Sequence, residues 1–161
     1  MPKYQLIERE RKFLLAGEQV NITGLRQKLI TDYYLKGAML RFRVVTDEEG
    51  QHYKLTQKSS ANTAGEAAIT TIYLNKQEFE LLNIFDAVTV SKTRYLLQSG
   101  QLVIGLDHYL TKTDELWLAE VEFSSIEEML GFELQLPHIS EVTGQQEFDG
   151  YVLARRFQQS N

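Results

Sequence analysis

Charged residues spaced two apart recur along this sequence, and that spacing limits what the chain can fold into. The first example is "QLIERERKFLL" at residues 5–15, where Glu8, Glu10 and Lys12 lie between apolar flanks. Glu8 and Glu10 would point about 200° apart on a helix, but they share one face of a strand. At a separation of about 7 Å their carboxylates repel each other, which predicts compensating cations nearby. We therefore expect a β-strand whose charged face meets basic residues from other strands.

Four later segments also place two charged residues on one strand face, three of the pairs two residues apart and one pair four apart. The same-face pairs are Arg41 and Arg43, Lys54 and Lys58, Lys92 and Arg94, and Glu120 and Glu122. The alternate positions are mostly apolar, as with Phe42 between the two arginines and Val121 between the two glutamates. In a closed sheet one face lines the interior and the other meets the covering helices. The pattern therefore predicts a barrel with a charged, water-filled lumen and an apolar outer face.

Eight segments alternate with period two and are rich in β-branched and aromatic residues, which favours strands. The predicted strands are 5–15, 31–35, 39–46, 53–58, 67–74, 88–97, 102–109 and 115–123. Short helices are expected after the N-caps Asn75 and Ser124 or Ser125, and another helix near 145–157. The expected fold is α+β and mainly β: an eight-stranded antiparallel barrel, closed or nearly closed, with a few peripheral helices.

Composition narrows the setting in which the chain works. Its 161 residues are expected to form a single domain, 1–161, with its own core. The absence of cysteine excludes disulfides and thiolate metal sites and suits a reducing cytoplasm, where we expect the protein. A net charge of -5 gives no general attraction to nucleic acid or to an anionic membrane, and no segment resembles a membrane span. We expect no nucleic-acid or membrane partner, and either a monomer or a homodimer.

A lumen lined by both acids and bases would bind a divalent cation together with a highly anionic ligand. Carboxylate oxygens suit Mg²⁺ or Mn²⁺, and arginine and lysine bind phosphate oxygens. The residues therefore predict a small-molecule polyphosphate ligand. The alternative is an ordinary barrel with a dry core, whose charged faces point outward and form salt bridges.

Longer stretches of the sequence carry a family resemblance. The motif Glu8-x-Glu10-x-Lys12 is followed in order by "YYLKGAMLRFRV" (33–44), "YKLTQKS" (53–59), "VSKTRYLL" (90–97), "LAEVEF" (118–123) and "EVTG" (141–144). In these segments, which cover nearly the whole chain, the sequence resembles the CYTH family, the triphosphate tunnel metalloenzymes. The resemblance implies a tunnel of eight antiparallel strands in which acids hold a metal and bases hold a triphosphate.

The resemblance also implies roles for individual residues. The implied ligands of Mg²⁺ or Mn²⁺ are Glu8, Glu10, Asp107, Glu120 and Glu122. The implied phosphate-binding residues are Lys12, Arg41, Arg43, Lys54, Lys58, Lys92 and Arg94. Three of these residues are also implied in catalysis: Lys12, Glu120 and Glu122.

These roles imply a metal-dependent phosphohydrolase whose first expected substrate is inorganic tripolyphosphate, followed by a nucleoside or thiamine triphosphate. Two segments depart from the family pattern. The stretch "AGEAAITTIYL" (64–74) has Glu66 as its only acid and no basic residue, and Ile104-Gly105 replaces a Trp-Glu pair. The missing acids predict reduced hydrolysis. Two alternatives therefore stay open: a polyphosphate- or nucleotide-binding protein with little or no catalysis, and an adenylate cyclase of the same family.

Overall fold

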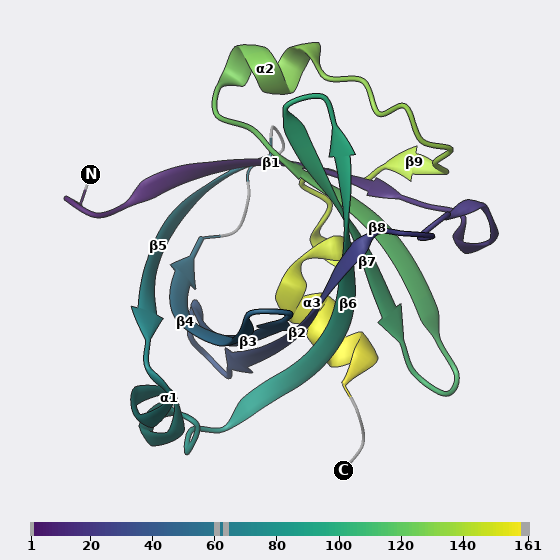
Figure 1. Cartoon of the computed structure of the whole chain (residues 1–161). Coiled ribbons are helices and arrows are strands. Elements are labelled where there is room, and N and C mark those ends of the chain that lie inside the picture. Colours follow the sequence, from purple (N-terminus) through teal and green to yellow (C-terminus); the bar gives the residue numbers. More distant parts are fainter. Residues whose placement is uncertain (1, 60–61, 63–64, 159–161) are drawn as a thin grey trace.

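The strands of the computed structural model, which describes residues 2–59, 62 and 65–158, form one antiparallel sheet. Their order is β5-β4-β3-β2-β6-β7-β8-β1-β9, and β5 also pairs with β1, which closes the barrel (Figure 1). The strands are β1 (Leu6–Leu14), β2 (Arg26–Leu35), β3 (Leu40–Asp47), β4 (Gly50–Lys58), β5 (Glu66–Leu74), β6 (Ala87–Ser99), β7 (Leu102–Leu110), β8 (Glu115–Glu122) and β9 (Ser140–Glu141). The prediction of a closed, eight-stranded antiparallel barrel is confirmed, with β9 as an additional strand.

The helices are short, and the first two begin at the predicted caps. They are α1 (Lys76–Leu82), α2 (Ile126–Gly131) and α3 (Gly150–Phe157), with the 3₁₀ turns η1 (Gly17–Gln19) and η2 (Gln146–Phe148). Asn75 and Glu78 form a reciprocal capping box at the start of α1, and the Ser125 side chain accepts from the Glu128 backbone N–H at the start of α2. Among the described residues, no helix is both long enough and apolar enough to cross a bilayer.

The structure departs most from the predicted elements in three places. β2 begins at Arg26 rather than at residue 31, and its first residues pair with β6. The prediction missed them because they are largely polar and show no apolar alternation. The expected helix 145–157 is divided into η2 and α3 by extended backbone at Asp149. β9 pairs with Phe13 and Leu14 of β1, and its two residues are too few to give a periodic pattern.

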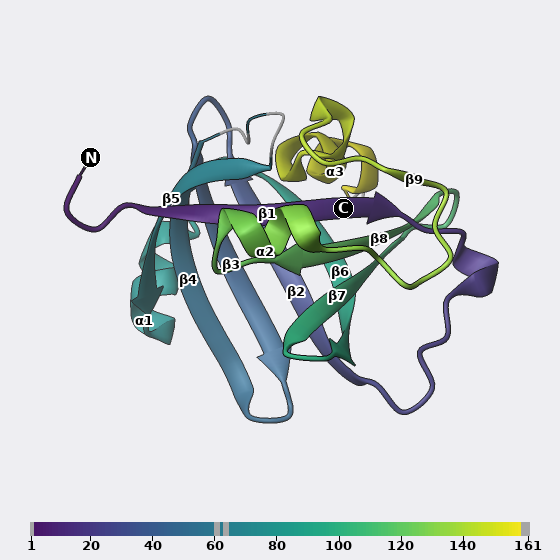
Figure 2. The same cartoon turned by 90° about the horizontal axis from the view of Figure 1, so that it is seen from above.

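The outer face of part of the barrel is buried in an apolar core. Phe13 of β1, Leu106 of β7 and Val121 of β8 pack with Met129 of α2, and each of these side chains is almost inaccessible to solvent. Figure 2 shows α2 and the segment after it running along this side of the barrel. This is the apolar strand face that the alternation predicted, covered by a helix.

A second apolar core lies on the inner face, at one end of the barrel. Val90 of β6 and Leu118 of β8 pack there with Leu153, Ala154 and Phe157 of α3. Figures 1 and 2 place α3 across this end of the barrel. The lumen is therefore not charged along its whole length as expected, because α3 supplies apolar side chains that fill one end and leave the charged residues beside this plug.

Candidate functional site

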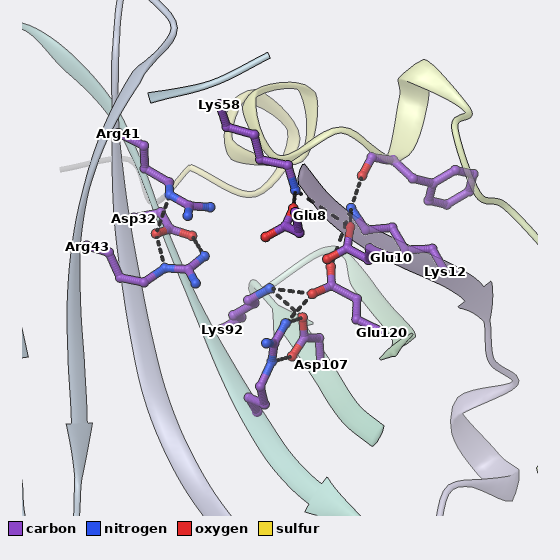
Figure 3. Close-up of polar contacts among 12 residues, drawn as sticks. Glu8, Glu10, Lys12, Asp32, Arg41, Arg43, Lys58, Lys92, Asp107 and Glu120 are labelled. Carbon is purple, nitrogen blue, oxygen red and sulfur yellow. Dashed lines mark hydrogen bonds and ion pairs between the residues drawn. The ribbon is translucent and has the colours of Figure 1, made fainter. Parts of the chain in front are cut away.

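The charged strand faces enclose a cavity of about 290 Å³ inside the barrel. Its charged lining residues are Glu8, Glu10, Lys12, Arg41, Arg43, Lys58, Lys92, Arg94, Glu120, Glu122 and Asp149. Figure 3 shows labelled side chains from β1, β3, β4, β6 and β8 pointing toward one another. The inward orientation contradicts the alternative of a dry barrel with its charged faces turned outward.

Three glutamates form a carboxylate cluster on neighbouring strands. Glu10 of β1 is the register partner of Glu122 of β8, and carboxylate oxygens of Glu8, Glu10 and Glu122 lie within 4.8 Å of one another. Burial, together with the charges of Glu8 and Glu10, raises the pKa of Glu122. We refer to these three residues as the glutamate cluster.

Lys58 of β4 is a cation that faces this cluster. Its ammonium forms an ion pair with Glu8 and lies 3.8 Å from a carboxylate oxygen of Glu10. Burial alone would lower the pKa of Lys58, but the charges of Glu10 and Glu8 outweigh it and raise that pKa. Lys12 adds a second ammonium 3.3 Å from Glu10, so two lysines lie beside the three carboxylates. An all-oxygen donor set of this kind fits a hard divalent cation.

The basic wall opposite is built around a buried aspartate. Arg43 Nε and Nη2 donate to the two carboxylate oxygens of Asp32 at 2.6 and 2.8 Å. Burial would raise the pKa of Asp32, but Arg43 and Arg41 outweigh it and lower that pKa to about 2. Arg41 Nε is buried without a hydrogen-bond acceptor, 3.6 Å from the nearest oxygen of Asp32. Arg41 therefore pairs with Asp32 through charge rather than through a hydrogen bond, as Figure 3 illustrates, and Arg41 also lines the cavity.

Lys12 bridges the acids of the two strands that meet at the cavity. Its ammonium lies 3.3 Å from Glu10 and 3.4 Å from Glu120, and donates to the Phe148 carbonyl oxygen at 3.3 Å. Burial would lower the pKa of Lys12, but Glu10 and Glu120 outweigh it and raise that pKa well above its ordinary value. Lys12 is therefore a permanent positive charge and not a proton acceptor at neutral pH.

Asp107 and Glu120 lie in a separate group of ion pairs deeper in the wall. Asp107 is fully buried and accepts from Arg94 Nε at 2.6 Å, from Arg94 Nη2 at 2.7 Å and from Lys92. Glu120 accepts from Arg94 and lies 3.7 Å from Lys92, and these charges outweigh its burial and lower its pKa well below the ordinary value. The structure thus places Asp107 against cations and outside the glutamate cluster.

Two predicted site residues do not line the cavity. Asp107 is enclosed by Arg94 and Lys92, and Lys54 has its ammonium 5.2 Å from the ring centroid of Tyr73, on neighbouring β5. Burial, then Arg43 and Arg41, lower the pKa of Lys54. All other predicted site residues lie on the cavity wall, while their roles as ligands and catalysts stay predictions.

The sequence analysis missed several residues that belong to the site. Tyr34, Thr56, Tyr109 and Asp149 line the cavity, and Asp32 holds the two arginines. Asp32 is the one charged residue of the predicted strand 31–35, and that was the available signal. Tyr109 shares a strand face with Asp107 two residues before it, so period-two alternation could have placed it inside.

Solved structures of similar fold include triphosphatases and candidate cyclases. The inorganic triphosphatase NE1496 is 27% identical over 91% of this chain and 93% of its own, with a TM-score of 0.60. A candidate adenylate cyclase from Bacillus halodurans shares the fold at 17% identity, over 98% of this chain and 95% of its own, with a TM-score of 0.57. HpAC1 from Hippeastrum shares it at 12% identity, over 77% of this chain and 83% of its own, with a TM-score of 0.59. HpAC1 is described as a candidate adenylyl cyclase with a dominant triphosphatase activity. No family model and no curated protein matches the chain.

Proposed function

We propose, from the premise that this chain is a CYTH-type triphosphate tunnel domain, that it is a divalent-metal-dependent triphosphatase. The observation that carries the proposal is the juxtaposition, in one enclosed cavity, of the glutamate cluster with Arg41, Arg43 and Lys58. A site with acids at one wall and guanidinium groups at the other complements a metal–polyphosphate complex. Inorganic tripolyphosphate is the first substrate to test, with nucleoside and thiamine triphosphates after it.

The basic side chains bind and orient the substrate. Arg41 and Arg43 both line the cavity and are both held against Asp32, so their guanidinium groups can donate to phosphate oxygens without first being ordered. Lys12 carries its positive charge between Glu10 and Glu120 and stabilises negative charge that develops on a phosphoryl group beside it. The enclosing barrel limits the access of bulk water to these contacts, which strengthens them.

The glutamate cluster would hold the divalent ion, Mg²⁺ or Mn²⁺. When bound, such an ion neutralises phosphate charge and makes a water molecule a better nucleophile. The chain's own contribution is the fixed spacing of the three carboxylates, which the β1–β8 register sets. Glu120, already paired with Lys12 and Arg94, anchors the cations beside the cluster.

The test is phosphate release from tripolyphosphate with Mg²⁺ or Mn²⁺ as the added ion. We expect activity that a chelator abolishes and that falls at least about 100-fold in Glu10→Gln, because removal of one ligand charge lowers metal occupancy. Glu80→Gln on α1 is the matched control, since this exposed glutamate lies outside the cavity. Undiminished hydrolysis by Glu10→Gln, or in the presence of the chelator, would refute the proposal.

A binding protein without hydrolysis is the second candidate, and β5 favours it. Ala67 is the register partner of Glu8 on the cavity side, whereas Glu66 forms an ion pair with Arg9 on the other face. Among the described residues of β5, no acid lines the cavity. Calorimetry with tripolyphosphate beside the hydrolysis assay separates the two, because tight binding without phosphate release identifies a binding protein. Formation of cyclic AMP and pyrophosphate from ATP would instead identify a cyclase.

A further inference from the structure

The five acids predicted as metal ligands divide into two groups with different surroundings. Carboxylate oxygens of Glu8, Glu10 and Glu122 approach one another within 4.8 Å; Lys58 contacts Glu8 and Glu10, and Lys12 contacts Glu10. Asp107 and Glu120 instead have nitrogen donors on their oxygens. A metal ion could join the first group by displacing the Lys58 ammonium, with Lys12 still beside Glu10. To reach Asp107, which is fully buried, it would have to displace donors of both Arg94 and Lys92.

The donors of the second group come mainly from Arg94. Its Nε and Nη2 both donate to Asp107, and Nη2 also contacts Glu120. Lys92 adds an ion pair to Asp107 and lies 3.7 Å from Glu120. The guanidinium thus lies between the two carboxylates, in the position that a bridging cation would take.

Gly105 provides the space for this arrangement. It is the register partner of Glu120, and a Cβ atom on it would lie 2.9 Å from Arg94 Nε, 3.0 Å from Cδ and 3.2 Å from Cζ. Its backbone does not have the positive φ that favours glycine. Glycine is needed at this position because a side chain would collide with Arg94, and not because of the backbone conformation. Any larger residue would press on the guanidinium that joins Asp107 to Glu120.

We propose that Arg94, accommodated by Gly105 and supported by Lys92, is a built-in cation for Asp107 and Glu120, so that the chain binds one divalent ion and not two. The inference rests on the proposed function, because it assumes that the glutamate cluster is the metal site. Arg94 is then a positioning residue, which fixes Glu120 beside Lys12 and leaves Asp107 with no role as a metal ligand.

Counting bound Mn²⁺ by electron paramagnetic resonance, without any polyphosphate, tests the inference on the full chain. We expect one Mn²⁺ per wild-type chain and none in Glu122→Gln at concentrations that saturate the wild type. Arg94→Gln is expected to retain the first ion and gain a second, weaker one, because it frees oxygens of Asp107 and Glu120. Lys28→Gln, which removes a half-exposed cation outside the cavity, is the control and should keep one ion.

Each outcome decides a different point. Two ions in the wild type, or one ion persisting in Glu122→Gln, would overturn the inference and leave the triphosphatase proposal standing. A folded Arg94→Gln that still binds one ion would overturn the role given to Arg94. If Arg94→Gln does not fold, the wild type and Glu122→Gln still decide the number and place of the ions. No bound ion in the wild type would instead count against the metal dependence of the proposed function.

Discussion

Asp32 and Arg43 form a two-point ion pair across the register of β2 and β3, with N–O distances of 2.6 and 2.8 Å. Asp32 is only 3% exposed, and Arg41 lies on its other side. One buried acid therefore orients two arginines of the cavity wall. The same pair also has consequences for the stability of the fold, because each partner would be a buried, unpaired charge without the other.

The substitution Asp32→Asn should destabilise the protein strongly. It leaves Arg43 buried beside a neutral amide, and breaking a buried ion pair from one side costs about 3–5 kcal/mol. Urea denaturation at pH 7 measures the loss of unfolding free energy. Asp86→Asn is the matched control, because Asp86 forms an exposed pair with Lys36 and its loss should cost less than about 1 kcal/mol. Equal effects of the two substitutions would contradict the importance of the buried pair.

Acid should remove the contribution of Asp32 to stability in a defined range of pH. Its pKa is lowered from 3.8 to about 2 in the folded protein, so the unfolded chain binds the proton more readily. The stabilisation is fully present above the unfolded pKa and is lost as the pH falls from about 4 to about 2, by roughly 2–3 kcal/mol. Denaturation curves from pH 5 to pH 2 would show this loss in the wild type. A variant with Asp32→Asn should show a shallower slope over that range, and an identical slope would refute the assignment.

Lys54 should matter little for ligand binding, although the family resemblance implies a phosphate contact for it. Its ammonium lies over Tyr73 and does not line the cavity, whereas Arg41 does. We expect Lys54→Met to change the affinity for tripolyphosphate by less than about threefold and Arg41→Met to weaken it at least about tenfold, since a charge-assisted contact contributes about 1.5–3 kcal/mol. Calorimetry with Mg²⁺ present compares the two. A larger loss in Lys54→Met than in Arg41→Met would contradict the cavity wall described here.

Period-two alternation was sufficient to predict the barrel and the inward direction of most charged side chains. Arg41, Lys92 and Glu120 line the cavity because a strand residue two positions from another shares its face, and that relation is local. The alternation could not show which carboxylates meet which cations. Asp107 is two residues beyond Gly105, yet its partners Lys92 and Arg94 come from β6 and depend on the pairing register.

The apolar plug was also beyond a local reading of the sequence. The sequence predicted a peripheral helix near 145–157, but not that this helix packs against the inner face of β6 and β8. Which face of the sheet a helix covers depends on the path of the connection that leads to the helix. Here the chain after α2 passes through β9 and η2 before it reaches α3, and a local pattern does not show that path. The charged part of the lumen is shorter than expected for that reason.

The substitution Leu153→Ala should test whether α3 is a structural part of the barrel. Leu153 is 1% exposed among Val90, Leu118 and Phe157 of the inner core, and removing a buried leucine side chain costs about 2–5 kcal/mol through lost burial and the cavity left behind. Leu81→Ala on α1 is the matched control, because Leu81 is 73% exposed and should contribute less than about 0.5 kcal/mol. Asp149 and Tyr151 line the cavity beside the plug, so a loosened α3 should also weaken tripolyphosphate binding. Thermal denaturation and calorimetry on both variants would measure the two effects, and a Leu153→Ala protein as stable as Leu81→Ala would show that α3 does not close this end of the barrel.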